Sequence, residues 1–169
     1  LTIASGGTYS ATSGTTTLTG PENAGYILVV SSSGTFTHNN GKMKADLNAD
    51  TYMNNTTYYD LEIAMDSASN KLGVEGSGSD TFVTVLNNLT VTSGKCIMAS
   101  DGDDITVHGL TDVASGAICG GTWSGNDQSG DMTFNGLVTN VGTFLTGTGT
   151  NNFNGGVRNL GPFTSDDTL

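Results

Sequence analysis

Apolar and polar residues alternate along most of this chain in short runs. Segments such as Leu61-Glu62-Ile63 and Leu89-Thr90-Val91 place apolar residues two positions apart, and such residues point to the same face of an extended strand. No window sustains the 3.6-residue period of an amphipathic helix. Gly, Ser, Thr and Asn separate the runs, and these residues favour turns. The pattern therefore predicts an all-β fold of many short strands.

One stretch of the pattern occurs twice. Residues 134–144 read F-N-G-L-V-T-N-V-G-T-F, and residues 153–163 read F-N-G-G-V-R-N-L-G-P-F. A fixed period of about 20 residues is typical of units that stack because none can bury its apolar face alone. After the shift, the identical pairs are Phe134/Phe153, Asn135/Asn154, Gly136/Gly155, Val138/Val157, Asn140/Asn159, Gly142/Gly161 and Phe144/Phe163.

The repeat predicts a parallel β-solenoid whose consecutive coils lie about 4.8 Å apart. Phe134, Gly136 and Val138 share one parity, so we expect them to form an inward stripe. A corner is expected at Asn140 and Gly142, because Asn and Gly tolerate left-handed backbone geometry. Stacked asparagines are expected to hydrogen-bond along the axis. The predicted structural stack consists of Phe134, Val138, Asn140, Phe144, Phe153, Val157, Asn159 and Phe163.

Looser echoes extend this pattern along the chain. Residues 59–63 recur at 87–91, and residues 107–118 resemble the repeat with stretched spacing. We therefore expect irregular turns of about 16–28 residues, with the extra length in side loops. Residues 1–169 are expected to form one solenoid segment of a longer chain. A small N-terminal module over residues 1–21 is the alternative.

The net charge of the chain argues against two classes of binding partner, nucleic acids and anionic membranes. Sixteen acidic residues against five basic ones give a formal net charge of −11. Such a surface repels phosphate backbones and disfavours anionic lipid. There is also no apolar run near 18 residues, the length that a membrane span requires. We therefore expect neither a nucleic-acid partner nor a membrane partner.

Candidate chemistry is sparse. Asp101, Asp103 and Asp104 surround a glycine and could offer clustered oxygen ligands to Ca²⁺, while a solvated β-turn is the alternative. His38 and His108 have no matching Ser/Asp or Cys pattern, and neither a Gly-x-Ser-x-Gly elbow nor a phosphate loop occurs. We therefore predict no catalytic residue, no enzymatic activity and no cofactor apart from this candidate Ca²⁺.

The two cysteines, Cys96 and Cys119, are separated by about one turn of the expected solenoid. Free cysteine behaves as a small buried apolar residue, so two unbonded core side chains are one interpretation. A disulfide across adjacent turns is the other. The sequence leaves both open.

Several phrases of the chain match a known repeat pattern. They are G-T-F-T-H-N-N-G at 34–41, Y-Y-D-L-E-I at 58–63 and L-T-V-T-S-G at 89–94. These phrases resemble the repeats of Thr/Asn/Gly-rich parallel β-solenoid (β-helix) proteins of marine bacteriophage virions and bacterial surfaces. The resemblance covers most of residues 34–163. It departs at 42–54, where charges interrupt the usual apolar strand.

This resemblance implies a structural or adhesive surface protein. It favours a bacteriophage virion component, such as a tail fibre, tailspike or capsid decoration, that acts as a rigid extracellular platform. Implied partners are further copies of the chain, with a trimer as one arrangement, and host-surface glycans or other virion proteins. A bacterial adhesin or surface-layer repeat domain is the first alternative. A β-helix polysaccharide lyase or hydrolase is the second, although lyase chemistry would need a basic residue and Arg158 is the single arginine.

Overall fold

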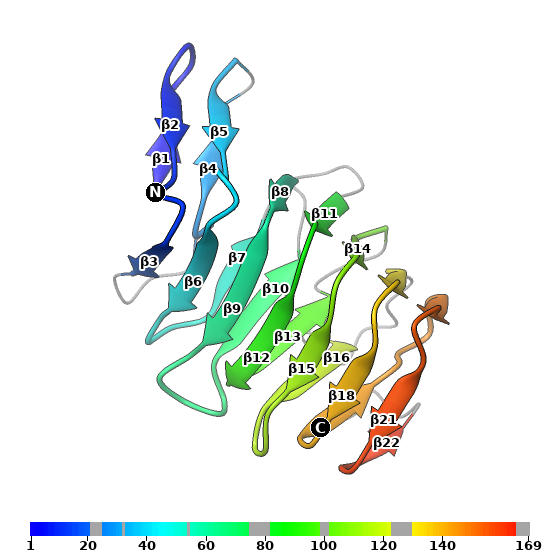
Figure 1. The fold of residues 1–169 in the computed structure, drawn as a ribbon. Helices are drawn as coiled ribbons and strands as arrows, with labels where there is room; N and C mark the ends of the chain where they lie inside the picture. Colours follow the sequence, from blue (N-terminus) through cyan, green and yellow to red (C-terminus); the bar gives the residue numbers. More distant parts are fainter. Residues whose placement is uncertain are drawn as a thin grey trace.

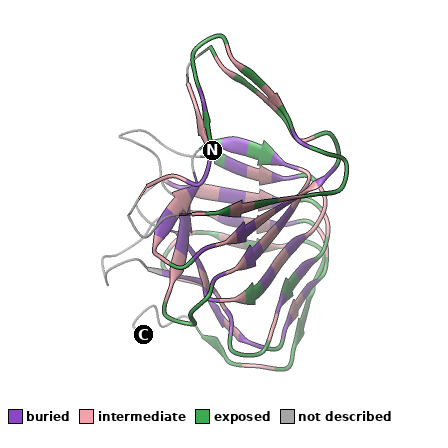
Figure 2. Cartoon of the chain, turned by 90° about the vertical axis from the view of Figure 1, so that its left-hand side faces the viewer, coloured by how far each residue is buried: buried purple, intermediate pink, exposed green. Residues whose placement is uncertain are grey.

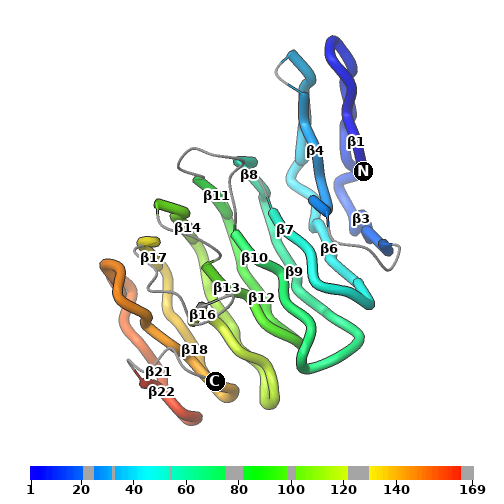
Figure 3. The backbone as a smooth tube through the Cα atoms, turned by 180° about the vertical axis from the view of Figure 1, so that it is seen from behind, coloured from blue at the N-terminus to red at the C-terminus, as the bar shows by residue number. Residues whose placement is uncertain are grey.

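The chain winds as a parallel β-solenoid of about five turns, as the repeat predicts. The computed structural model describes residues 1–20, 25–31, 33–53, 55–74, 82–98, 102–122 and 130–164, and no helix occurs among them. Figure 1 shows the coils following one another from the blue N-terminal end to the red C-terminal end. Figure 3 shows the same succession from behind.

Each full coil contributes one strand to each of three parallel sheets. The seven-stranded sheet contains β3 (Thr15–Thr19), β6 (Lys42–Asp46), β9 (Asp60–Ala64), β12 (Leu89–Ser93), β15 (Thr111–Val113), β18 (Val138–Asn140) and β21 (Val157–Asn159). The six-stranded sheet contains β7 (Thr51–Met53), β10 (Lys71–Val74), β13 (Lys95–Met98), β16 (Ile118–Thr122), β19 (Thr143–Leu145) and β22 (Phe163–Thr164). The five-stranded sheet contains β8 (Thr56–Tyr58), β11 (Phe82–Val85), β14 (Asp104–Val107), β17 (Met132–Phe134) and β20 (Asn151–Phe153).

Two short sheets complete the N-terminal end. They pair β1 (Thr2–Ile3) with β4 (Val29–Val30), and β2 (Thr8–Ser10) with β5 (Thr35–Thr37). Tyr9 stacks on Phe36 at 6.3 Å, and Phe36 packs against Tyr58 of β8 at the same distance. The aromatic side chains of β2 and β5 thus continue the row of packed rings that includes Tyr58 of the five-stranded sheet.

The core consists of the apolar residues that alternate with polar ones along the strands. Inward residues of β9 and β12, such as Leu61, Ile63, Leu89 and Val91, are buried, and the residues between them face outward. Figure 2 shows buried segments lining the interior of the coils and exposed ones at the rim. The echo between residues 59–63 and 87–91 is a true coil repeat, because Leu61 pairs with Leu89 and Ile63 with Val91.

The nineteen-residue repeat marks two consecutive coils in parallel register. Phe134 pairs with Phe153, Val138 with Val157, Asn140 with Asn159 and Phe144 with Phe163. The rings of Phe134 and Phe153 stack at 5.4 Å, and those of Phe144 and Phe163 stack at 5.1 Å. On the last described coil the stack opens to solvent, where Val157 is 39% and Phe163 38% exposed.

One detail of the predicted stripe is wrong. Phe134, Gly136 and Val138 do not share a strand, because β17 ends at Phe134 and β18 begins at Val138. Gly136 forms the corner between them. A side chain there would meet the coil below, since a Cβ on Gly136 would lie 2.1 Å from the carbonyl oxygen of Gly109. The expected corner after Asn140 is present as a bend at Val141 and Gly142.

The charged segment where the resemblance departs is a regular strand. In β6, Met43 and Ala45 are buried while Lys42, Lys44 and Asp46 alternate with them on the outer face. Met43 pairs with Leu61, and Ala45 with Ile63. The charges therefore decorate the solenoid without disturbing its register.

Tyr58 is a buried polar residue whose removal has a defined expected effect. Its side chain is fully buried, and its hydroxyl has no hydrogen-bond partner among the described residues. An unpaired buried hydroxyl is costly. At neutral pH we therefore expect Tyr58→Phe to leave the free energy of unfolding unchanged or to raise it by about 1 kcal/mol, as measured by guanidinium denaturation.

At alkaline pH the free energy of unfolding of the wild type should fall below that of Tyr58→Phe. Burial raises the pKa of the Tyr58 phenol far above its ordinary value, whereas an unfolded tyrosine ionises near pH 10. Above about pH 10 the unfolded state therefore binds fewer protons than the folded state, and stability falls as pH rises. For each pH unit, the free energy of unfolding of the wild type should fall by up to about 1.4 kcal/mol more than that of Tyr58→Phe. Parallel pH profiles would contradict this assignment.

Candidate functional site

The outer face of the five-stranded sheet carries a column of polar side chains that follows the solenoid axis. Thr57 pairs in register with Thr84, Thr84 with Thr106, Thr106 with Thr133, and Thr133 with Asn152. We refer to these five residues as the threonine column. Neighbouring strands lie about 4.8 Å apart, so the column spans about 19 Å. Each coil in this part of the stack therefore presents one polar group at the same position.

The column combines hydrogen-bonding groups with apolar surface. Each threonine hydroxyl both donates and accepts hydrogen bonds. Phe82 and Leu86 lie two residues to either side of Thr84 and are 51% and 41% exposed. Hydroxyls beside exposed apolar side chains are groups with which proteins hold neutral polar ligands. The face is therefore chemically able to contact a repeating, uncharged surface.

A second row of side chains runs beside the threonine column on the last three described coils, one residue beyond the ends of β14, β17 and β20. Asn154 donates from Nδ2 to Oδ1 of Asn135 over 2.8 Å, and Asn135 Nδ2 lies 3.1 Å from His108 Nδ1. We refer to these three residues as the amide ladder. All three are exposed. When residues 107–118 are aligned with the repeat, His108 takes the position of Asn135 and Asn154.

An inner amide contact links the same coils. Asn140 is fully buried and donates from Nδ2 to Asn159 Oδ1 over 2.8 Å and to the Pro162 carbonyl over 2.9 Å. We expect Asn140→Ala to lower the free energy of unfolding by about 1–3 kcal/mol, because it removes two hydrogen bonds that a buried side chain donates to the next coil. Guanidinium denaturation measures this cost.

Asn135→Ala is the matched control. It removes the exposed amide contacts to Asn154 and His108, where water can replace the lost partner. Its cost should stay within about 0.5 kcal/mol. Equal costs for the two substitutions would show that the inner contact does not hold the coils together.

The predicted Ca²⁺ ligands Asp101, Asp103 and Asp104 differ in their surroundings. Asp103 is buried, and Asp104 Oδ1 accepts a hydrogen bond from the Asp131 backbone N–H at 2.8 Å. Asp131 Oδ1 accepts likewise from the Thr150 N–H at 2.7 Å. Asp101 lies outside the described residues, and within the described ranges no three His, Cys, Asp or Glu side chains are grouped to hold a metal. The Ca²⁺ site stays a prediction, while Asp104 and Asp131 join successive coils.

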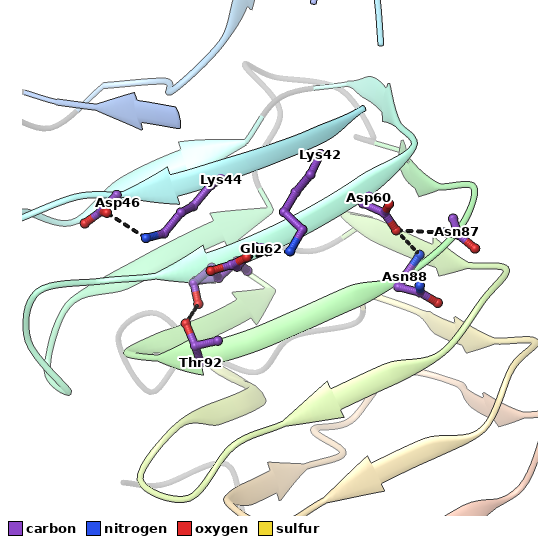
Figure 4. A network of polar contacts seen from close by, with 9 residues as sticks. Lys42, Lys44, Asp46, Asp60, Glu62, Asn87, Asn88 and Thr92 are labelled. Atoms are coloured by element: carbon purple, nitrogen blue, oxygen red, sulfur yellow. Dashed lines mark hydrogen bonds and ion pairs between the residues drawn. The ribbon is translucent and has the colours of Figure 1, made fainter. Parts of the chain in front are cut away.

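The seven-stranded sheet presents a contrasting, charged face (Figure 4). Lys42 Nζ lies 2.8 Å from Glu62 Oε2 on the next coil, and Lys44 Nζ lies 2.8 Å from Asp46 Oδ2. The hydrogen bond to Asp46 raises the pKa of Lys44. Exposed ion pairs of this kind contribute little stability. They neutralise part of this face. On the five-stranded sheet, by contrast, Asp104 lies on the outer face of β14 two residues before Thr106, and its carboxylate accepts a backbone hydrogen bond.

A corner of the charged face is held by one carboxylate. Asp60 Oδ1 accepts hydrogen bonds from Asn87 Nδ2 and from the Asn88 backbone N–H, both at 2.9 Å (Figure 4). Asn88 Oδ1 in turn accepts from the Leu110 N–H on the following coil at 2.9 Å. These contacts join three consecutive coils, so the polar residues at this corner act as struts.

Comparisons of the chain with protein-family models, with curated proteins and with solved structures give no match. In the described part of the chain, no helix has the length and apolar character needed to cross a membrane. The functional interpretation therefore depends on the residues and on their geometry.

Sequence reasoning did not find the threonine column. Its members are separated by unequal intervals, and Thr is abundant throughout the chain. A usable signal was present, however. Each member comes directly before the last inward residue of its strand, which is Tyr58, Val85, Val107, Phe134 or Phe153. Aligning those inward residues first would have brought the column together.

Proposed function

We propose that this chain is a structural and adhesive surface element, part of a bacteriophage tail fibre, tailspike or capsid decoration. The observation that carries the proposal is the threonine column, which repeats one polar group per coil on one face of a regular stack of strands. The resemblance to solenoid repeats of virions and bacterial surfaces supports the same assignment. A bacterial adhesin would also present a repeating polar face to its partner, and it is the second candidate.

The solenoid suits such a role for a physical reason. Its stability accumulates from contacts between neighbouring coils, so a long exposed platform needs no single large core. The platform presents the column to the partner, which we propose to be a host-surface glycan or another surface protein. Assembly as a homo-oligomer, with a trimer as one arrangement, would multiply weak contacts.

Location on the particle tests the biological assignment. Antibodies raised against this domain would be applied to purified virions and to host cells, with immunogold labelling read by electron microscopy. Label on virions is the expected result. Label confined to uninfected cell surfaces would replace the virion assignment by the adhesin. Label on neither would remove both.

Binding to intact host cells tests the proposed face. Thr106→Lys places a charge in the middle of the column, and Thr90→Lys places the same charge on the seven-stranded sheet. Both residues are half-buried and outward in the middle of the stack. Thr106→Lys should weaken binding of the labelled domain at least about tenfold, equivalent to about 1.4 kcal/mol. Equal losses for the two variants would exclude the threonine column as the contact surface.

A further inference from the structure

The two cysteines of the chain lie directly over one another. Cys96 of β13 pairs in register with Cys119 of β16 on the next coil. Both are buried, with exposures of 0% and 1%, and both are unbonded in the structure. Neighbouring strands place their Cα atoms about 4.8 Å apart, within the 4.4–6.8 Å range that a disulfide spans.

The two thiols also face one another. The hydrogen bond with Cys96, followed by burial, raises the pKa of the Cys119 thiol. A thiol held neutral is a poor nucleophile. Reaction of this pair is therefore expected while the coils are packing or when they open locally, because both sulfurs are closed off in the completed stack.

A β-bulge follows Cys119 in β16. The register between β13 and β16 shifts immediately after the cysteine pair, so that Met98 lies opposite Thr122. Gly120 and Gly121 form this bulge with φ angles of 86° and 81°. A Cβ on Gly120 would lie 1.8 Å from the Leu145 carbonyl oxygen, so the position requires glycine. The extra residue of this bulge comes after Cys119, so the cysteine pair itself keeps the regular parallel register.

We propose that Cys96 and Cys119 form a disulfide that staples consecutive coils when the chain folds in the presence of a small-molecule disulfide. One cysteine thiolate attacks a sulfur of glutathione disulfide and releases a glutathione thiolate. The second cysteine thiolate then attacks the mixed disulfide and releases the second glutathione. The two cysteine sulfurs lose two electrons, the oxidant gains them, and the two thiol protons pass to the released glutathione. The inference does not depend on the proposed surface role.

Chemical cleavage at methionine detects the bond directly. The unfolded, reduced protein would be refolded with glutathione disulfide or with dithiothreitol, then alkylated and cleaved with cyanogen bromide. Cleavage after Met65, Met98 and Met132 places Cys96 in fragment 66–98 and Cys119 in fragment 99–132. After oxidative refolding the two fragments should stay joined until a reductant is added. Fragments that separate without reductant would overturn the proposal.

Thermal melting tests whether the bond fits the native stack. Closing this loop should raise the Tm of the oxidised protein by about 5–10 °C over the same protein after reduction. The double variant Cys96→Ala/Cys119→Ala should melt identically under both conditions, which excludes a general effect of the redox buffer. An oxidised form that melts at or below the reduced form would show that the bridge strains the coils. Protein secreted into an oxidising compartment supplies both readouts if refolding from denaturant fails.

Discussion

Phe134→Ala is expected to lower the free energy of unfolding by about 3–5 kcal/mol, the usual cost of truncating a buried phenylalanine. The Phe134 side chain is fully buried. Its ring stacks on Phe153 at 5.4 Å and meets the edge of Phe144 at 5.6 Å. The substitution therefore opens a cavity between two coils that the stack cannot close. Guanidinium denaturation followed by circular dichroism measures the cost.

Phe163→Ala is the matched control for this substitution. Phe163 belongs to the same aromatic cluster and stacks on Phe144 at 5.1 Å, but its side chain is 38% exposed on the last described coil. Less apolar area is buried there, so its loss should be about 1–2 kcal/mol. If the two substitutions cost the same, burial between coils is not what makes the aromatic stack stabilising.

Gly136→Ala is expected to cost about 3 kcal/mol, at the upper end of the range for overpacking. Gly109, Gly136 and Gly155 lie over one another at one corner of the solenoid. A Cβ on Gly136 would lie 2.1 Å from the Gly109 carbonyl oxygen, so the backbone of two coils must separate to admit it. Circular dichroism should show a lower Tm, with native strand content at low temperature.

Gly116→Ala separates steric conflict from backbone strain. Gly116 has a φ of 82°, but a Cβ there would find no atom within 4 Å. Its cost should be that of one residue in left-handed geometry, about 1–2 kcal/mol. A larger loss for Gly116→Ala than for Gly136→Ala would mean that the close approach of coils at the glycine corner is not limiting.

The fold could be predicted because one stretch of the sequence repeats at both core and corner positions. The spacing of Phe134 and Phe153 indicates the coil period, and Asn140 indicates a corner. The strand boundaries inside that period were not readable. Gly136 continues the parity of its neighbours, and only the close approach of the coil below shows that it turns the chain.

Polar segments were harder to interpret than apolar ones. Residues 45–57 are rich in Asn, Asp and Thr, a composition typical of loops, yet they contain β7 and most of β8. Thr51 and Thr56 are buried there and donate hydrogen bonds to the carbonyls of Gly25 and Asn55. Threonine is both a good strand residue and a polar one, so composition does not decide which role it takes. Coil register decides it, and register is a property of the folded stack.

The spacing of the stacked strands determines how the molecule should respond to force. Among the described residues every coil pairs with the coils directly before and after it, at separations from 18 residues (Met43 with Leu61) to 29 residues (Ala64 with Ser93). A chain pulled from one end should therefore peel away one coil at a time. Each rupture should release roughly 60–90 Å of extended polypeptide at about 3.3 Å per residue. Such a rod would lengthen stepwise under load while the coils still in place keep their shape.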